Sequence, residues 1–263
     1  MRSIVWTFLL LTAAALTACK SGQKNVSVSL KTTSTPATST TAGTTADPQN
    51  GIVLTEVRMV VRKITLFPTQ QTPDAKPPSS DMDTEHPEAD DQDELPRSSF
   101  GPFAVDFPGS SLSGGIHPVF DADVDKGTYA GARIAVNSLK HDFQTTDPVL
   151  SAMQGLHASI AIDGTIDGAT FEFKTPMRVA QWKKGPIVVG DGTTNLTLDV
   201  DPTGWFTAPD GKTRLDPRLD TDRGQILENI RCSIRLFKDD DRDGEPDDGD
   251  HNEPEGCSAP SGD

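Results

Sequence analysis

The stretch ASIAIDGTIDGATFEFKT at residues 158–175 decides the fold class of this chain. Ile160 and Ile162 are separated by one residue, and so are Phe171 and Phe173. Apolar side chains that recur with a period of two are typical of a β-strand with one buried face, because successive side chains point to opposite sides of a sheet. The stretch therefore predicts strands, with one face in a core.

The same alternation recurs elsewhere in the chain, between clusters of Gly, Pro, Asp and Asn. It is clearest in two sets of apolar residues: Ala132, Ile134 and Val136, and Leu196, Leu198 and Val200. No regular alternation of strands with helices appears, which argues against a doubly wound α/β fold. We expect a single domain over residues 51–238, mainly β, built as an antiparallel β-sandwich of the immunoglobulin or transthyretin kind.

Two segments are ambiguous between helix and strand. Residues 53–64 fit a helical stripe, but Val57, Met59 and Val61 also alternate, and the β-branched content favours a strand. Near the end of the domain, Ile226, Ile230, Ile234 and Phe237 share one helical face.

For this second segment, Asp222 is a candidate N-cap, and the basic residues Arg231, Arg235 and Lys238 suit a helix C-terminus. The competing pattern is a strand through Ile230, Cys232, Ile234 and Leu236. We predict one C-terminal amphipathic helix in the domain.

The N-terminus has the layout of an exported lipoprotein. An apolar run begins at Ile4 and ends with Leu16, Thr17, Ala18 and Cys19, of which the last three are small. It is too short to span a bilayer comfortably, as expected of a secretory signal. It resembles a bacterial lipobox, which implies removal of residues 1–18, acylation of Cys19 and attachment to the cell envelope; Lys20 implies the outer membrane. An ordinary signal peptide or an uncleaved anchor is the alternative.

Charge and cysteine content agree with export. The formal charge is −15, and no cluster of basic residues is longer than a pair. The chain therefore has no basic face for nucleic acid, and an anionic bilayer would repel it. The lipid would therefore supply the attachment to the membrane. With Cys19 assigned to lipid, Cys232 and Cys257 remain as one possible disulfide, although Cys232 on a strand would instead be a small core residue.

Three segments are predicted to lie outside the folded core. Residues 19–50 are expected to form a disordered tether, since ten of the fourteen positions from Thr32 to Thr45 are Ser or Thr. As a flexible coil it would hold the domain roughly 30 Å from the membrane. Residues 69–99 are Pro-rich and acidic and are expected to form a disordered loop. Residues 239–263 are expected to form an acidic tail.

This tail contains the one constellation with specific chemistry. Counted from Asp239, a twelve-residue loop carries carboxylates at positions 1, 3, 5, 9 and 12, from Asp239, Asp241, Asp243, Asp247 and Asp250, with Gly244 at position 6. Ca²⁺ takes six to eight oxygen ligands, and the main-chain carbonyl of Glu245 would supply one more. The pattern departs from an EF-hand in ending on Asp and in containing Pro246. A solvated acidic tail is the alternative.

The loop resembles the thrombospondin type 3 repeat, in which Gly, Pro and Asp follow in the order seen at Gly244, Pro246 and Asp247. The resemblance covers about twelve residues in a single copy and implies calcium bound by the aspartates named above. Cys257 arrives later than the cysteine of that family. A weaker cluster, Asp121, Asp123 and Asp125, is better explained as the acidic outer face of a strand.

No enzyme class is indicated. The five histidines have no pair at metal-ligand spacing, and the Ser-rich segment 109–114 lacks the pattern of a nucleophile elbow. Several stretches together, including Gly127 to Tyr129 and Trp205 with Phe206, resemble a family of bacterial envelope lipoproteins whose β-sandwich domain has no assigned function. The resemblance implies a non-enzymatic module that binds a surface partner or supports the envelope. The alternatives are a polysaccharide hydrolase and a carrier of an apolar ligand.

Overall fold

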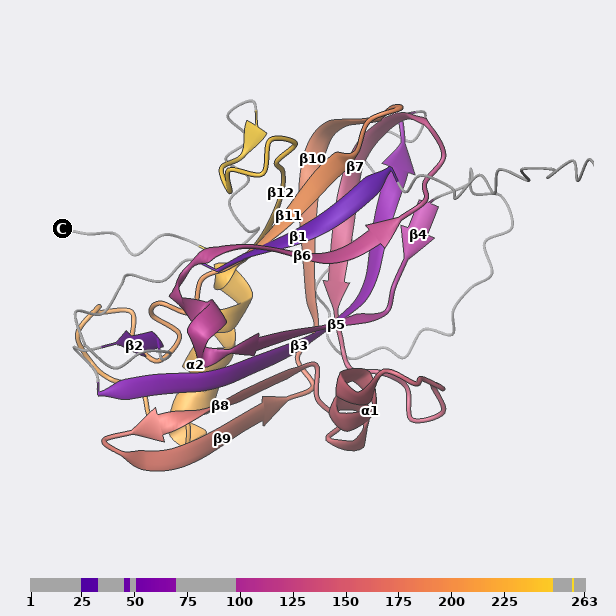
Figure 1. The fold of residues 1–263 in the computed structure, drawn as a ribbon. Coiled ribbons are helices and arrows are strands. Elements are labelled where there is room, and N and C mark those ends of the chain that lie inside the picture. Colours follow the sequence, from indigo (N-terminus) through magenta and orange to yellow (C-terminus); the bar gives the residue numbers. More distant parts are fainter. Residues whose placement is uncertain (1–24, 33–44, 48–50, 70–97, 248–256, 258–263) are drawn as a thin grey trace, which may run out of the picture.

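The computed structural model describes residues 25–32, 45–47, 51–69, 98–247 and 257. It confirms a mainly β chain with two sheets arranged as a sandwich. Figure 1 shows the smaller sheet crossing the part of the larger sheet that contains β7 and β10, while α1, β8 and β9 lie at the other end of the molecule.

The smaller sheet, sheet A, has four strands in the order β12-β11-β1-β6. Their bounds are Ile234–Lys238 for β12, Thr194–Val200 for β11, Val26–Thr32 for β1 and Gly115–Ala122 for β6. β1 pairs parallel with β11 and antiparallel with β6. The prediction of a purely antiparallel sandwich is therefore wrong for sheet A. Its one parallel pair arises because β1 enters between two strands from later in the chain.

The larger sheet, sheet B, follows the path β10-β7-β3-β8-β9, with three further strands paired to β3. The bounds along the path are Val179–Val189 for β10, Gly127–Val136 for β7, Ile52–Pro68 for β3, Ile160–Ile166 for β8 and Ala169–Thr175 for β9. The further strands are β2 (Thr45–Asp47), β4 (Ser98–Phe100) and β5 (Phe103–Pro108). The strand prediction for residues 53–64 is confirmed.

β3 organises sheet B because it extends over both halves of the molecule. Its first half pairs with β8, from Ile52 opposite Ile166, and its second half pairs with β7, ending with Pro68 opposite Tyr129. The start of β7 and the β8–β9 turn consequently lie at opposite ends of a strand of 17 residues.

β1 corrects the prediction of a tether over residues 19–50. Val26, Val28 and Leu30 are each 1% exposed and belong to the main core, and β2 pairs with β3. The alternation VSVSLKT was present in the sequence, but it is short and is surrounded by Ser and Thr. Only pairing with β11 and β6 makes it a strand, since isolated strands gain too little burial to order themselves.

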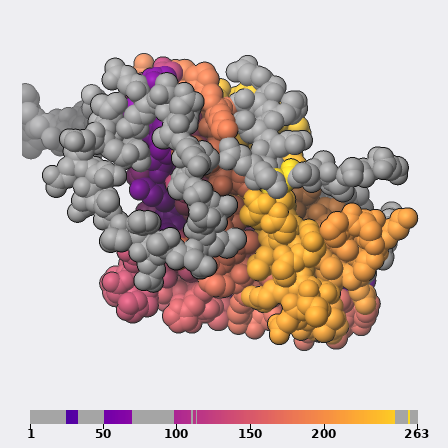
Figure 2. Space-filling view, turned by 180° about the vertical axis from the view of Figure 1, so that it is seen from behind, coloured from indigo at the N-terminus to yellow at the C-terminus, as the bar shows by residue number. Residues whose placement is uncertain are grey.

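The C-terminal helix prediction is partly wrong. α2 covers Asp220–Ser233 and β12 follows directly, so the segment is a helix and then a strand. Figure 2 shows this C-terminal part of the chain, orange to yellow, at the surface of the face turned away in Figure 1. Ile226 and Ile230 are buried on the helical face, whereas Ile234 and Leu236 alternate into the core opposite β11. Asp222 lies in the first turn and accepts a hydrogen bond from the Asp216 N–H (2.8 Å) instead of capping the helix as the N-cap residue.

A second helix, α1 (Pro148–Gly155), was not predicted. Asp147 caps it, accepting hydrogen bonds from the N–H groups of Val149 (2.8 Å) and Leu150 (3.0 Å), and Pro148 occupies the first turn. The helix buries Met153 in a cluster with Val60 of β3 that is separate from the main core. Among the described segments there is also a short 3-10 helix, η1, at Gly109–Ser113.

The remaining predictions on disorder concern residues that are mostly outside the described ranges. Of the loop 69–99, Ser98 and Ser99 belong to β4, and residues 70–97 lie outside the described residues. Of the tail 239–263, residues 239–247 form an ordered loop with the contacts given below.

Candidate metal centre

The acidic loop covers the outer face of sheet A. After β12 the chain turns back, and Lys31 of β1 donates a hydrogen bond from Nζ to the Gly244 carbonyl (2.6 Å). A Cβ at Gly244 would lie 3.1 Å from Ile116 of β6, and its φ of +84° is a conformation that glycine adopts without strain. Gly244 thus lets the loop approach the sheet closely, which places residues 239–244 over β11 and β1.

Three of the predicted ligands come together in this loop. Carboxylate oxygens of Asp239, Asp241 and Asp243 all lie within 4.8 Å of one another. Asp239 is fully buried, while Asp241 and Asp243 are exposed. The spacing of alternate residues along a turn, inferred from the sequence, is what directs these three side chains to one place.

Asp239 is held in position by neutral donors. Its carboxylate accepts hydrogen bonds from the Thr197 hydroxyl (2.9 Å) and from the N–H groups of Asp243 (3.0 Å) and Gly244 (3.2 Å). Burial raises the pKa of this carboxyl above its usual range, against the lowering effect of these three hydrogen bonds. A buried carboxylate next to two others is unfavourable in its ionised form unless a cation compensates it.

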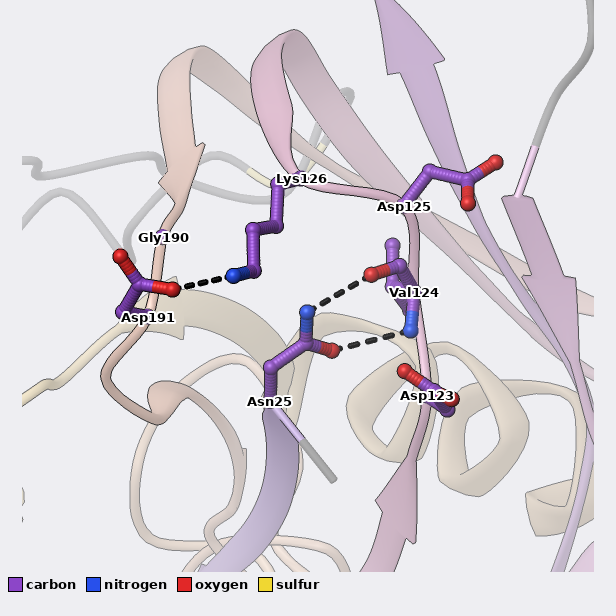
Figure 3. A pocket seen from close by; sticks show the side chains of 7 residues that line it. All are labelled: Asn25, Asp123, Val124, Asp125, Lys126, Gly190 and Asp191. Atoms are coloured by element: carbon purple, nitrogen blue, oxygen red, sulfur yellow. Dashed lines mark hydrogen bonds and ion pairs between the residues drawn. The ribbon is translucent and has the colours of Figure 1, made fainter. Parts of the chain in front are cut away.

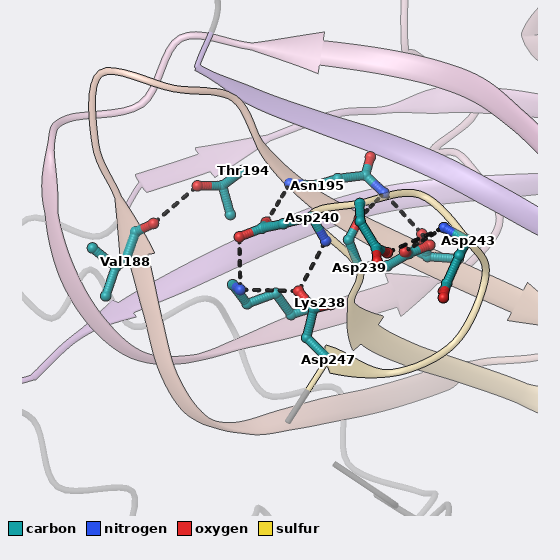
Figure 4. Close-up of polar contacts among 10 residues, drawn as sticks. Val188, Thr194, Asn195, Lys238, Asp239, Asp240, Asp243 and Asp247 are labelled. Atoms are coloured by element: carbon teal, nitrogen blue, oxygen red, sulfur yellow. Dashed lines mark hydrogen bonds and ion pairs between the residues drawn. The ribbon is translucent and has the colours of Figure 1, made fainter. Parts of the chain in front are cut away.

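Asp247 is directed elsewhere. Its carboxylate accepts hydrogen bonds from Lys238 Nζ (3.0 Å) and from the Asp240 N–H (2.9 Å), and Lys238 also contacts Asp240 (2.7 Å). Burial alone would raise the pKa of Asp247, but these donors together outweigh it, so the pKa is lowered. For Lys238 the two carboxylates outweigh burial and raise the pKa. Figure 4 shows this group beside the Asp239 cluster.

The remaining two predicted ligands are Glu245 and Asp250. The Glu245 side chain pairs with Lys31 (3.2 Å between Nζ and Oε1), and the sequence assigned only its main-chain carbonyl to the metal. Asp250 lies outside the described residues.

A buried polar layer lies beneath the loop and was not predicted from the sequence. Ser29 donates to the Asn195 side-chain oxygen (2.8 Å), and Asn195 donates to the Thr197 hydroxyl (2.9 Å) and the Asp239 carbonyl (2.9 Å). Ser27, also buried, has a hydroxyl with no hydrogen-bond partner. The alternation of Ser with Val in β1 was the available signal, but it indicates a solvent face unless something is known to cover it.

Cys232 and Cys257 form the disulfide that the cysteine count suggested, with 5.5 Å between their Cα atoms and 25 residues of sequence separation. Cys232 lies in the last turn of α2. The covalent loop closed by this bond contains β12 and the whole acidic segment, so the two ends of that segment are tied to the domain.

A second acidic region lines an open hollow of about 360 Å³ at the end of the sandwich where β1 begins. It contains Asp123 and Asp125, which are exposed on either side of the buried Val124. The strand interpretation of the cluster holds only for Asp121, because β6 ends at Ala122 and the other two aspartates lie in the connection to β7. Lys126 pairs with Asp191 across the hollow (Figure 3), and this contact lowers the pKa of Asp191.

The described histidines do not join either acidic group. His117, His141 and His157 are exposed, and among the described residues no histidine belongs to a cluster of metal-ligating side chains. His86 and His251 lie outside those residues. Segment 109–114, considered above as a nucleophile loop, forms η1 and its end.

Within the described segments, none of the helices has the length and apolar character that crossing a membrane requires. Comparison of the chain with protein-family models, with curated proteins and with solved structures found no match.

Proposed function

We propose that this protein is a lipid-anchored, non-enzymatic module of the bacterial cell envelope, stabilised by calcium in the loop that follows β12. The observation that carries the calcium assignment is Asp239: a fully buried carboxylate whose hydrogen bonds come from a hydroxyl and two N–H groups, next to Asp241 and Asp243. Calcium would supply the missing positive charge.

The donor set fits calcium better than other common metals. All three donors are carboxylate oxygens, which suit a hard cation, whereas zinc sites use mainly His and Cys. Calcium accepts irregular shells of six to eight oxygens, so water and main-chain carbonyls, that of Glu245 included, would complete the shell. Magnesium requires a smaller octahedron and should substitute poorly.

Calcium is expected to raise the melting temperature of the soluble chain that begins at Lys20. At about ten times the dissociation constant, mass action adds about 1.4 kcal/mol to the free energy of unfolding. For a domain of this size that is about 4 °C. Calorimetric titration and thermal melts in calcium and in chelator would measure both quantities.

The matched pair of variants is Asp241→Asn/Asp243→Asn against Asp121→Asn/Asp123→Asn, which removes the same charge from exposed positions elsewhere. The first pair should lose most of the calcium increment and the second should keep it. A wild-type chain that gives no heat with millimolar calcium and melts unchanged would show that the loop is only an acidic segment.

The lipid anchor is supported by the signal sequence alone. Cys19→Ala should abolish metabolic labelling with palmitate, make processing insensitive to globomycin and release the protein from the membrane fraction, because the acyl chains supply the attachment. Cys257→Ala should leave labelling unchanged. Membrane attachment of the Cys19→Ala variant equal to that of the wild type would contradict the assignment.

A binding or structural role is favoured over the two alternatives by particular features. The described apolar side chains between the sheets form one continuous buried cluster, which supports a filled interior and not a carrier cavity. In the acidic hollow Lys126 pairs with Asp191 and lowers its pKa, so this carboxyl does not suit the role of a glycosidase acid, which needs a raised pKa.

A further inference from the structure

The folded domain begins very close to the proposed lipid anchor. Asn25 lies six residues after Cys19, and six peptide units span at most about 20 Å. The position of Asn25 is fixed: its side chain donates to the Val124 carbonyl (2.7 Å) and accepts from the Val124 N–H (2.9 Å), and its carbonyl accepts from the Thr194 N–H (2.9 Å). Whatever holds Cys19 therefore also holds this end of the sandwich.

The surface around Asn25 consists of the β6–β7 and β10–β11 connections, residues 123–127 and 190–193, which are exposed apart from Val124 and the half-buried Gly190. The opposite end, with the β8–β9 turn, is removed from it by the length of β3, about 50 Å along the strand. The short link thus keeps this end of the molecule within about 20 Å of the membrane surface, whereas it sets no such limit on the other end.

The chemistry of this end suits a zwitterionic surface. Asp123, Asp125 and Asp191 outnumber Lys126, whose ammonium is paired with Asp191. Anionic headgroups would be repelled, whereas zwitterionic phospholipids have no net charge and present ammonium groups that can pair with the carboxylates. Val188 of β10, which is 59% exposed, lies at the same end because its register partner is Thr128, next to the start of β7. It adds one exposed apolar side chain to this end of the sheet.

We propose that the membrane-facing end, defined as Asn25 with residues 123–127 and 190–193, rests on zwitterionic phospholipid headgroups and holds the sandwich upright on the bilayer. The inference rests on the proposed lipidation of Cys19. The domain would then lie directly on the membrane surface, and not at the distance that a tether over residues 19–50 would allow.

The test uses the full, lipidated protein in vesicles of phosphatidylcholine and phosphatidylethanolamine that contain a headgroup-nitroxide lipid. A fluorophore is placed at Asp123→Cys in one variant and at Ala169→Cys, on the β8–β9 hairpin, in the other. Emission from position 123 should be largely lost, because nitroxide quenching needs close approach, while position 169 should keep the emission that it has in detergent.

Two controls separate the possible failures. Flotation with the vesicles and the mass of the acylated N-terminus report lipidation; a chain that is not acylated refutes the anchor proposed above, and the inference with it. Inserting about 20 Gly and Ser residues after Gly22 adds a span of about 25 Å and should restore emission at position 123 with flotation unchanged. For an acylated, floating protein, equal quenching at positions 123 and 169 overturns the seated orientation, and quenching at position 123 that survives the insertion overturns the role given to the short link.

Discussion

A chain that begins at Gly51 is expected not to fold, whereas a chain that begins at Lys20 should give a cooperative unfolding transition. The shorter chain lacks β1, which supplies Val26, Val28 and Leu30 to the core and pairs on both sides within sheet A. Fully burying each such side chain is worth about 1.5–3 kcal/mol, and a typical domain is stable by only 5–15 kcal/mol. Circular dichroism and limited proteolysis would distinguish the two chains.

Leu30 alone should show how much β1 contributes to the stability of the domain. Leu30→Ala should lower the free energy of unfolding by about 2–5 kcal/mol, because Leu30 is fully buried and its removal leaves a cavity. Leu219→Ala is the matched control, since Leu219 is 52% exposed, and it should change the stability little. Urea titration measures both. Equal effects of the two substitutions, or a folded chain starting at Gly51, would mean that β1 is not part of the stable domain.

Loss of the disulfide is the second large effect. The double variant Cys232→Ser/Cys257→Ser is expected to lose about 3 kcal/mol of unfolding free energy, since the bond closes a loop over a separation of 25 residues and restricts the unfolded chain. Urea titration of the two chains in chelator would give this value without any contribution from calcium.

The variant should also bind calcium more weakly than the wild type. The loop closed by the disulfide contains Asp239, Asp241 and Asp243. Without the disulfide this segment has more conformational freedom, so calcium binding must lose more conformational entropy to order it. Calorimetric titration of both chains gives the ratio of affinities. A double variant that matches the wild type in stability and in affinity would refute the view that the C-terminal segment is fastened to α2 and to the metal loop.

The β-sandwich was accessible from the sequence because four strands of sheet B, β3, β7, β8 and β9, each carry their own signal. Alternation in 158–175 and β-branched residues in 53–64 are local properties, and they indicate strands whatever lies next to them. The close approach of Asp239, Asp241 and Asp243 was accessible for a similar reason, since alternate residues of a tight turn converge on one side. Local spacing therefore determined the fold class and the core of the candidate site.

Tertiary contacts decided the rest. β1 has the pattern of a strand, yet its place between β11 and β6 depends on residues about 170 and 90 positions away, respectively. The change from helix to strand at Ser233 follows from the pairing of β12 with β11, which outweighs the helical periodicity of the same residues. Local propensity is weak compared with the burial that such pairing brings.

The sequence by itself determined that the strands alternate, that Cys232 and Cys257 can pair, and that carboxylates gather after residue 238. Only the tertiary structure decided that Asp239 is buried while Asp247 turns to Lys238, and that the Ser and Thr side chains of sheet A lie beneath a loop. The physical reason is that alternation reports which residues share a face of a strand. What covers that face is set by a distant part of the chain.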